Sequence, residues 1–98
     1  MRRRGSAIGA EFYGKGVDIA LGPSVGPLGL FPAGGRNWEG FGPDPYLAGV
    51  SVGETVAGIQ DEGVVACVKH YILNEQEHYR GSISAELDDR VMHEVFLW

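Results

Sequence analysis

At residues 64–71 the chain runs Val64-Val65-Ala66-Cys67-Val68-Lys69-His70-Tyr71. The run is apolar at every position up to Val68, and charged or polar residues follow it directly. A strand that is apolar on both alternating faces is typical of a parallel β-sheet covered by helices on both sides. The stretch therefore predicts an α/β fold, and it draws attention to the polar residues at the C-terminal end of the strand.

The segments around this strand alternate between helical and extended patterns. Residues 6–13 have a weak helical pattern ended by Gly14 and Gly16, and residues 17–21 form a short predicted strand. Asp44 and Pro45 then predict a helix start, and Gly63 predicts its end. Between them Ala48, Val52, Val56 and Ile59 recur at helical spacing, and Leu47 and Val50 widen this apolar stripe. Asp88 or Asp89 begins a last helix, whose pattern continues to Trp98. This order predicts parallel β/α units.

Two strands are too few to close a hydrophobic core. The chain has 98 residues, whereas an eight-stranded α/β barrel needs about 250. A parallel strand pair also needs neighbours on both sides. We therefore expect residues 1–98 to be a segment of a larger domain.

A long loop at residues 24–43 separates the first strand from the capped helix. It is rich in Gly and Pro, without a regular period, and it contains Arg36, Trp38, Glu39 and Phe41. Long loops in compact domains are usually functional, and charged and aromatic residues among glycines suit binding. Exposing two large aromatic rings is unfavourable, so Trp38 and Phe41 are expected to be covered.

Composition excludes several classes of protein. A net charge of −5 argues against a nucleic-acid binder, and the basic cluster 1–4 is interpreted as a solvated helix end. No apolar stretch is long enough to span a membrane, and no apolar signal core follows the arginines. Cys67 is the single cysteine, so no internal disulfide can form, and its apolar neighbours predict a buried small side chain.

Four basic side chains are candidates for a binding site. Lys69 and His70 end the second strand, Arg36 lies in the loop after the first strand, and Arg80 follows the second. Functional residues of α/β folds gather at the C-terminal ends of strands, so these groups are expected to meet on one side of the sheet. Arg and Lys present several donors that adjacent sugar hydroxyls accept. A phosphate is the rival ligand, but no phosphate-binding glycine motif is present.

Other site chemistries are less favoured. The residues that could ligate a metal, namely His70, His78, His93, Glu75 and Glu77, do not follow the H-E-x-x-H spacing. No metal or cofactor is therefore expected, and His93 is interpreted as an exposed or satisfied helix residue. Among the carboxylates, Asp44 is explained as a helix cap and Glu39 is expected to pair with a nearby cation. Nothing in the spacing forces a catalytic acid/base pair.

Two motifs resemble signatures of glycoside hydrolase family 3. The first is Gly35-Arg36-Asn37-Trp38-Glu39-Gly40-Phe41 followed by Asp44-Pro45, and the second is Lys69-His70-Tyr71-Ile72 followed by Asn74-Glu75-Gln76-Glu77-His78-Tyr79-Arg80. The second motif is similar to that of fungal β-glucosidases in particular. The resemblance implies an N-terminal domain that is a TIM-type barrel. Residues 1–98 would be an incomplete part of this domain, with about two β/α units.

The resemblance also implies an activity. It is the retaining hydrolysis of terminal non-reducing β-D-glucosyl residues, from β-glucosides and cello-oligosaccharides, with release of β-D-glucose. β-Xylosidase and N-acetylglucosaminidase activities are close alternatives within the family. A non-catalytic truncated remnant, a sugar-binding module and a small self-standing α/β binding module remain open as well. Family members of this type are commonly secreted, so an extracellular location is expected.

By motif position, the resemblance assigns substrate binding to Arg36, Lys69, His70 and Arg80. Strand alternation would point Lys69 and His70 to opposite faces, so a strained or cis peptide is predicted next to His70. The catalytic aspartate of the family lies in a Ser-Asp-Trp-like motif that is absent here, and the acid/base belongs to a later region. The implied partner is therefore the remainder of the barrel and the C-terminal domain of a full-length enzyme.

Overall fold

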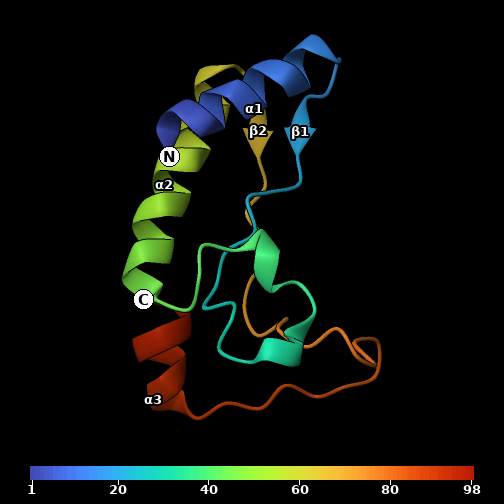
Figure 1. Cartoon of the computed structure of the whole chain (residues 1–98), viewed down its shortest axis with the longest axis vertical. Coiled ribbons are helices and arrows are strands. Elements are labelled where there is room, and N and C mark those ends of the chain that lie inside the picture. Colours follow the sequence, from blue (N-terminus) through green and yellow to red (C-terminus); the bar gives the residue numbers. More distant parts are fainter.

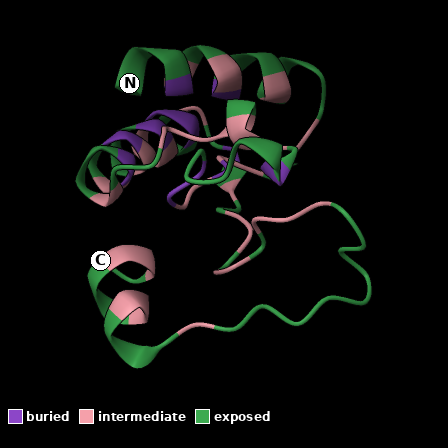
Figure 2. Cartoon of the chain, turned by 60° about the horizontal axis from the view of Figure 1, so that its bottom comes forward, coloured by how far each residue is buried: buried purple, intermediate pink, exposed green.

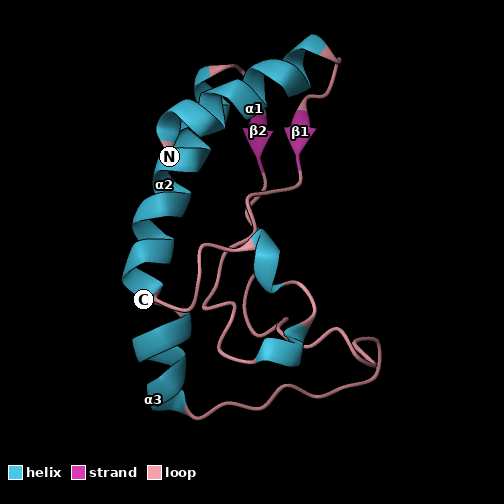
Figure 3. Cartoon of the chain, in the orientation of Figure 1, coloured by secondary structure: helices cyan, strands magenta, loops and turns pink.

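The computed structural model describes all residues, 1–98, and places two parallel strands beside a pair of helices (Figure 1). The main elements are α1 (Arg2–Gly14), β1 (Ile19–Ala20), α2 (Pro45–Asp61), β2 (Val65–Ala66) and α3 (Asp89–Val91), which continues as a π-helical segment (Met92–Phe96). Two short 3₁₀ helices, Pro32–Gly34 and Asn37–Glu39, interrupt the long loop. The predicted order of elements is confirmed. Figure 3 shows that loops connect most of these elements.

The helix boundaries follow local signals. Asp44 caps α2 by accepting a hydrogen bond from the Leu47 amide at 2.6 Å, and Gly63 after α2 has φ +83°. Asp88 caps α3 in the same way through the Val91 amide at 2.9 Å. The last helix ends at Phe96, so its predicted continuation to the end of the chain is wrong. None of the helices combines the length and the hydropathy that a membrane-spanning helix needs.

The two strands are shorter than predicted. Ile19 pairs with Val65 and Ala20 with Ala66 in parallel register, instead of the predicted strands at 17–21 and 64–71. Each strand has only one neighbouring strand, and regular parallel pairing is limited to these two residue pairs. Beyond them the two segments still run side by side, because the Lys69 amide donates to the Pro23 carbonyl at 3.2 Å.

Small residues bring α1 and α2 into close contact. A Cβ atom on Gly9 would lie 2.8 Å from the Ile59 carbonyl oxygen, and a Cβ on Gly5 or Gly58 would meet the opposite backbone closer still. Arg2 forms a two-bond fork with Asp61, at 3.0 and 3.1 Å. The contact therefore runs backbone to backbone, with an ion pair at its edge.

The buried face of α2 differs from the predicted apolar stripe. Its buried residues are Ala48, Ser51, Thr55, Gly58 and Ile59. The stripe is confirmed at Ala48 and Ile59, whereas Val52 and Val56 are half-buried. The predicted widening of the stripe is wrong, because Leu47 and Val50 are exposed. A close helix crossing selects small side chains at the contact, and this explains the difference.

Only one side of the strand pair is covered. Ala20, Ile59 and Val64 form the core, with Ile8 and Phe12 packed against it. Figure 2 shows the buried residues gathered between the helices and strands, with a long exposed segment leading to α3.

The uncovered side contradicts two predictions. Val65 is 54% exposed, so the predicted covering of the strand on both sides is not seen. Cys67 is also exposed, although it was predicted to be buried. Both residues lie on or beside a strand with one helix layer against it. The basic cluster 1–4 is exposed at the start of α1, as predicted.

Candidate functional site

The candidate site lies in the loops that follow the C-terminal ends of β1 and β2. Both arrowheads in Figure 1 point toward these loops. Backbone hydrogen bonds join the two loops, since the Val25 amide donates to the Lys69 carbonyl at 2.8 Å and the Glu77 amide to the Gly34 carbonyl at 3.1 Å. The long loop 24–43 and the loop after β2 therefore form one structure at the expected edge of the sheet.

Arg36 is the centre of this site. Its Nε and Nη2 atoms donate to the two carboxylate oxygens of Glu39, at 3.0 and 2.7 Å. Its Nη1 atom lies 2.9 Å from Nε2 of His70. The two side chains of the fork are 24% and 19% exposed, so solvent screens this pair less than a surface ion pair. The Arg36 guanidinium holds the pKa of Glu39 below its usual range, so this carboxyl group is ionised.

The hydrogen bond from Arg36 sets the protonation state of His70. A guanidinium only donates, so Nε2 of His70 must accept and its proton is assigned to Nδ1. Burial lowers the pKa of His70, and the positive charges of Arg36 and Lys69 lower it further. His70 is therefore a neutral imidazole whose Nδ1–H group can donate to a ligand.

The remaining two predicted residues join the site through carboxylates. Nζ of Lys69 lies 4.0 Å from Oε2 of Glu39. Arg80 donates to Oε2 of Glu77 at 2.9 Å, and Oε1 of the same carboxylate is 3.7 Å from Nη1 of Arg36. The Arg80 side chain is 61% exposed, which places it at the rim. We call the six residues Arg36, Glu39, Lys69, His70, Glu77 and Arg80 the charged cluster.

The backbone leaves strand geometry at Lys69. The peptide bond between Lys69 and His70 is cis, so the predicted departure from strand geometry next to His70 is confirmed. Tyr71 and Leu73 follow with φ of +65° and +66°, which is uncommon for residues other than glycine. The predicted strand to Tyr71 therefore ends before the charged cluster.

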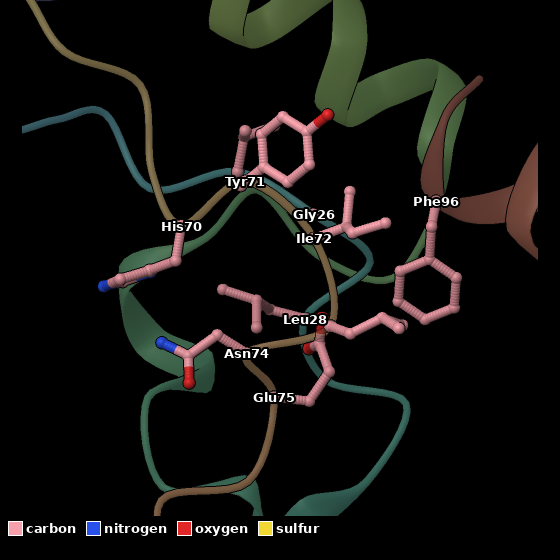
Figure 4. Close-up of a pocket in the computed structure, with 10 residues that line it drawn as sticks. Gly26, Leu28, His70, Tyr71, Ile72, Asn74, Glu75 and Phe96 are labelled. Carbon is pink, nitrogen blue, oxygen red and sulfur yellow. The ribbon is translucent and has the colours of Figure 1, made fainter. Parts of the chain in front are cut away.

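Glu75 belongs to the same motif as Glu77 but has a different environment. Figure 4 shows Glu75 in a small pocket with Leu28, Ile72 and Phe96, and His70 at its edge. Burial raises the pKa of Glu75. No group of three or more His, Cys, Asp or Glu side chains is arranged to hold a metal ion. His93 is exposed on the last helix, with Nδ1 2.8 Å from the Asp89 carbonyl oxygen, as expected for an exposed or satisfied helix residue.

Trp38 and Phe41 of the long loop are less covered than expected. Trp38 is 83% exposed, although it was predicted to be covered, and Phe41 is half-buried. Trp38 lines an open hollow together with Glu39 and Lys69. No other segment of the chain packs over its ring, which explains the exposure.

Sequence reasoning anticipated part of the charged cluster. The expected pairing of Glu39 with a cation is confirmed. The role of Glu77 between two arginines was missed. Both Arg36–Glu39 and Glu77–Arg80 are three residues apart, a spacing at which opposite charges meet in a helical turn. That spacing was the available signal.

A known protein family matches almost the whole chain. The model of the glycosyl hydrolase family 3 N-terminal domain matches residues 1–95. The chain belongs to glycoside hydrolase family 3. A curated relative, probable β-glucosidase L of Aspergillus terreus, is 58% identical over 98 residues, which cover 100% of this chain and 13% of the relative.

Solved structures of family 3 β-glucosidases have the same arrangement of elements. The enzyme of Neurospora crassa superimposes with a TM-score of 0.88 at 54% identity, over 99% of this chain and 13% of that one. DesR, a β-glucosidase of Streptomyces venezuelae in complex with D-glucose, superimposes with a TM-score of 0.93 at 30% identity, over 98% of this chain and 12% of that one. The chain thus has the fold of part of a TIM-type barrel, and it spans about a tenth of the length of its relatives.

Proposed function

We propose that this family 3 chain supplies part of the glucosyl-binding pocket of a retaining β-glucosidase, which releases β-D-glucose from the non-reducing ends of β-glucosides and cello-oligosaccharides. The observation that carries the proposal is the network in which Arg36 contacts His70 at 2.9 Å and shares Glu39 with Lys69. These side chains lie beyond the C-terminal ends of parallel strands, where α/β barrels bind substrates. Relatives named β-glucosidases support the substrate class.

The donors of the network suit a sugar ring. Arg36 has five N–H groups, and Glu39 and His70 engage three of them, so the others are available to a ligand. The Lys69 ammonium group lies 4.0 Å from Glu39 without donating a side-chain hydrogen bond, and the Lys69 side chain is 31% exposed. His70 adds the Nδ1–H donor. Several donors gathered in one cluster suit the adjacent hydroxyl oxygens of a monosaccharide, and Arg80 would contact the ligand from the rim.

Bond cleavage is assigned to groups outside this chain. A retaining glycosidase needs one carboxylate to attack the anomeric carbon and another carboxyl group to protonate the leaving oxygen. Glu39 and Glu77 are engaged by arginines, which suits charge balance better than attack. We therefore propose that residues 1–98 are an incomplete N-terminal domain that binds and orients the sugar, and that hydrolysis needs the remainder of the barrel and the C-terminal domain.

A segment exchange tests this proposal. The match to β-glucosidase L of Aspergillus terreus covers 98 positions for 98 residues, so the chain can replace the homologous segment without a change of length. We expect this chimera to hydrolyse 4-nitrophenyl β-D-glucoside within about tenfold of the host enzyme, since one decade corresponds to only 1.4 kcal/mol in the transition state. A folded chimera without this activity would refute the proposal.

Two further measurements separate the alternatives. Rates of the chimera on the matching β-xyloside and N-acetyl-β-glucosaminide should be lower than on the glucoside, and the reverse order would assign a different family activity. The free chain should show no hydrolysis. Secretion stays a prediction, and fractionation of the source culture would test it.

A further inference from the structure

Glu39 holds an unusual position within the charged cluster. It is the last residue of the short 3₁₀ helix Asn37–Glu39, and its amide donates to the Arg36 carbonyl at 3.1 Å. This turn brings the Glu39 carboxylate back onto the Arg36 guanidinium, with both oxygens engaged at 2.7 and 3.0 Å. The side chain is 19% exposed, so its charge is shielded from water by the loop.

The two-bond fork fixes the plane of the guanidinium. An arginine side chain has several rotatable bonds, and ordering it has an entropic cost. With Nε and Nη2 on one carboxylate, the direction of Nη1 is set, and Nη1 is the atom that contacts His70. Glu39 thereby determines where the remaining donors of Arg36 point.

Glu39 also separates two cations. Nζ of Lys69 lies 4.0 Å from the same Oε2 atom that accepts from Nη2 of Arg36. Without this carboxylate, two positive groups would face each other across a half-buried space and repel. Glu77 is a poor substitute, because its nearest oxygen is 3.7 Å from Nη1 of Arg36 and its other oxygen accepts the hydrogen bond of Arg80.

We propose that Glu39 is a positioning residue for sugar binding, which holds Arg36 and Lys69 with their free donors directed at one monosaccharide. This deepens the proposed function and rests on it. Glu39 acts through the two cations and not on the substrate itself. Both its charge and its two-oxygen geometry are required, because glutamine has one carbonyl oxygen and would turn an N–H group toward the guanidinium.

The test compares three substitutions in the chimera of the segment exchange. Glu39→Gln and Glu39→Ala should each lower kcat/KM for 4-nitrophenyl β-D-glucoside by about 10- to 100-fold, the size expected when reacting groups are displaced by about 1 Å. Glu39→Asp keeps the charge on a shorter side chain and should restore part of the loss. Asp61→Asn is the matched control, because it breaks an equivalent arginine fork, with Arg2, between α1 and α2. It should leave kcat/KM within about twofold.

A double-mutant cycle distinguishes positioning from a structural role. In an Arg36→Ala background the effect of Glu39→Gln should shrink severalfold, because the residue that it positions is gone. The melting temperature of the Glu39→Gln chimera should fall no further than that of the Asp61→Asn chimera. Independent, additive losses, or unfolding of Glu39→Gln alone, would assign Glu39 to structure and overturn the inference.

The proposed function and this inference fail in different ways. A folded but inactive chimera without substitutions overturns both. An active chimera whose kcat/KM is unchanged by Glu39→Gln and Glu39→Ala overturns the positioning role alone. Full activity of Glu39→Gln with loss in Glu39→Asp would likewise contradict it, since the account places the charge first.

Discussion

The α1–α2 helix pair and the charged cluster are held together in different ways. In the helix pair, Gly5, Gly9 and Gly58 let two backbones meet with no room for a Cβ atom. In the charged cluster, long side chains bridge segments that are far apart in the chain, such as Arg36 and His70. The helix pair depends on close packing of uncharged backbone atoms, whereas the charged cluster depends on hydrogen-bond direction and on charge.

This difference predicts different responses to substitution. The helix pair should be sensitive to added volume and nearly indifferent to the loss of a surface charge. The charged cluster should tolerate small changes of stability and yet lose function when one donor is removed. Substitutions that add volume and substitutions that remove a charged group can therefore be made in both regions, and their effects compared.

The largest effect is expected in the helix pair. In the chimera, Gly58→Ala would place a methyl group against the backbone of α1, so we expect a loss of about 3 kcal/mol or more in the free energy of unfolding. Urea or thermal unfolding measures it. Gly53→Ala lies on the same helix with open space around it, and should stabilise by about 0.5–1 kcal/mol. Equal effects at both glycines would contradict the close contact.

Removal of a donor from the charged cluster comes next. Lys69→Ala or His70→Ala in the chimera should cost about 2–4 kcal/mol of transition-state binding, because a buried sugar hydroxyl loses its partner. The measurement is kcat/KM on the aryl glucoside. Arg2→Ala in the helix pair removes a half-exposed ion pair and should leave kcat/KM unchanged. Near wild-type kinetics for both cluster variants would remove the basis of the site assignment.

The cap of α2 should have a smaller effect on stability. Asp44→Ala removes the acceptor of the Leu47 amide, with an expected cost of about 1 kcal/mol in unfolding. Asp44→Asn keeps a capping oxygen and should retain most of the stability. If asparagine were as destabilising as alanine, the contribution would come from charge rather than from the hydrogen bond.

The smallest effect concerns Glu75, the half-buried acid beside the cluster. Burial raises the pKa of Glu75 in the folded state above its unfolded value. Below the unfolded pKa the Glu75 carboxyl group is protonated in both states, so its burial carries no charge penalty. This contribution to the free energy of unfolding is lost as the pH rises through the folded pKa. Glu75→Gln should therefore stabilise at neutral pH and give no gain in acid. Glu54→Gln, at an exposed position of α2, should show no such pH dependence in unfolding experiments.

Local patterns in the sequence were enough to predict the order of elements and the helix caps. Asp44 and Asp88 cap helices because their side chains meet amides three residues later, a purely local contact. The convergence of Arg36 with His70 followed from the rule that strand ends share an edge of the sheet. These features depend on residues close in sequence or on general topology.

Burial could not be predicted in the same way, because it depends on what packs against each residue. The apolar neighbours of Cys67 and the large ring of Trp38 predict burial. In the structure one helix layer covers the strands beside Cys67, and no segment covers the Trp38 ring, so both residues are exposed. The close crossing at Gly5 and Gly58 also needs the relative placement of two helices. Local periodicity predicts neither the burial of these residues nor the close crossing of the two helices.

A crystal structure of the chimera with bound glucose tests the central claim most directly. We expect Nζ of Lys69, a free N–H of Arg36 and Nδ1 of His70 to lie within about 3 Å of hydroxyl groups on one glucose ring. A glucose ring bound elsewhere, or bound with these three side chains directed away from it, would contradict the account.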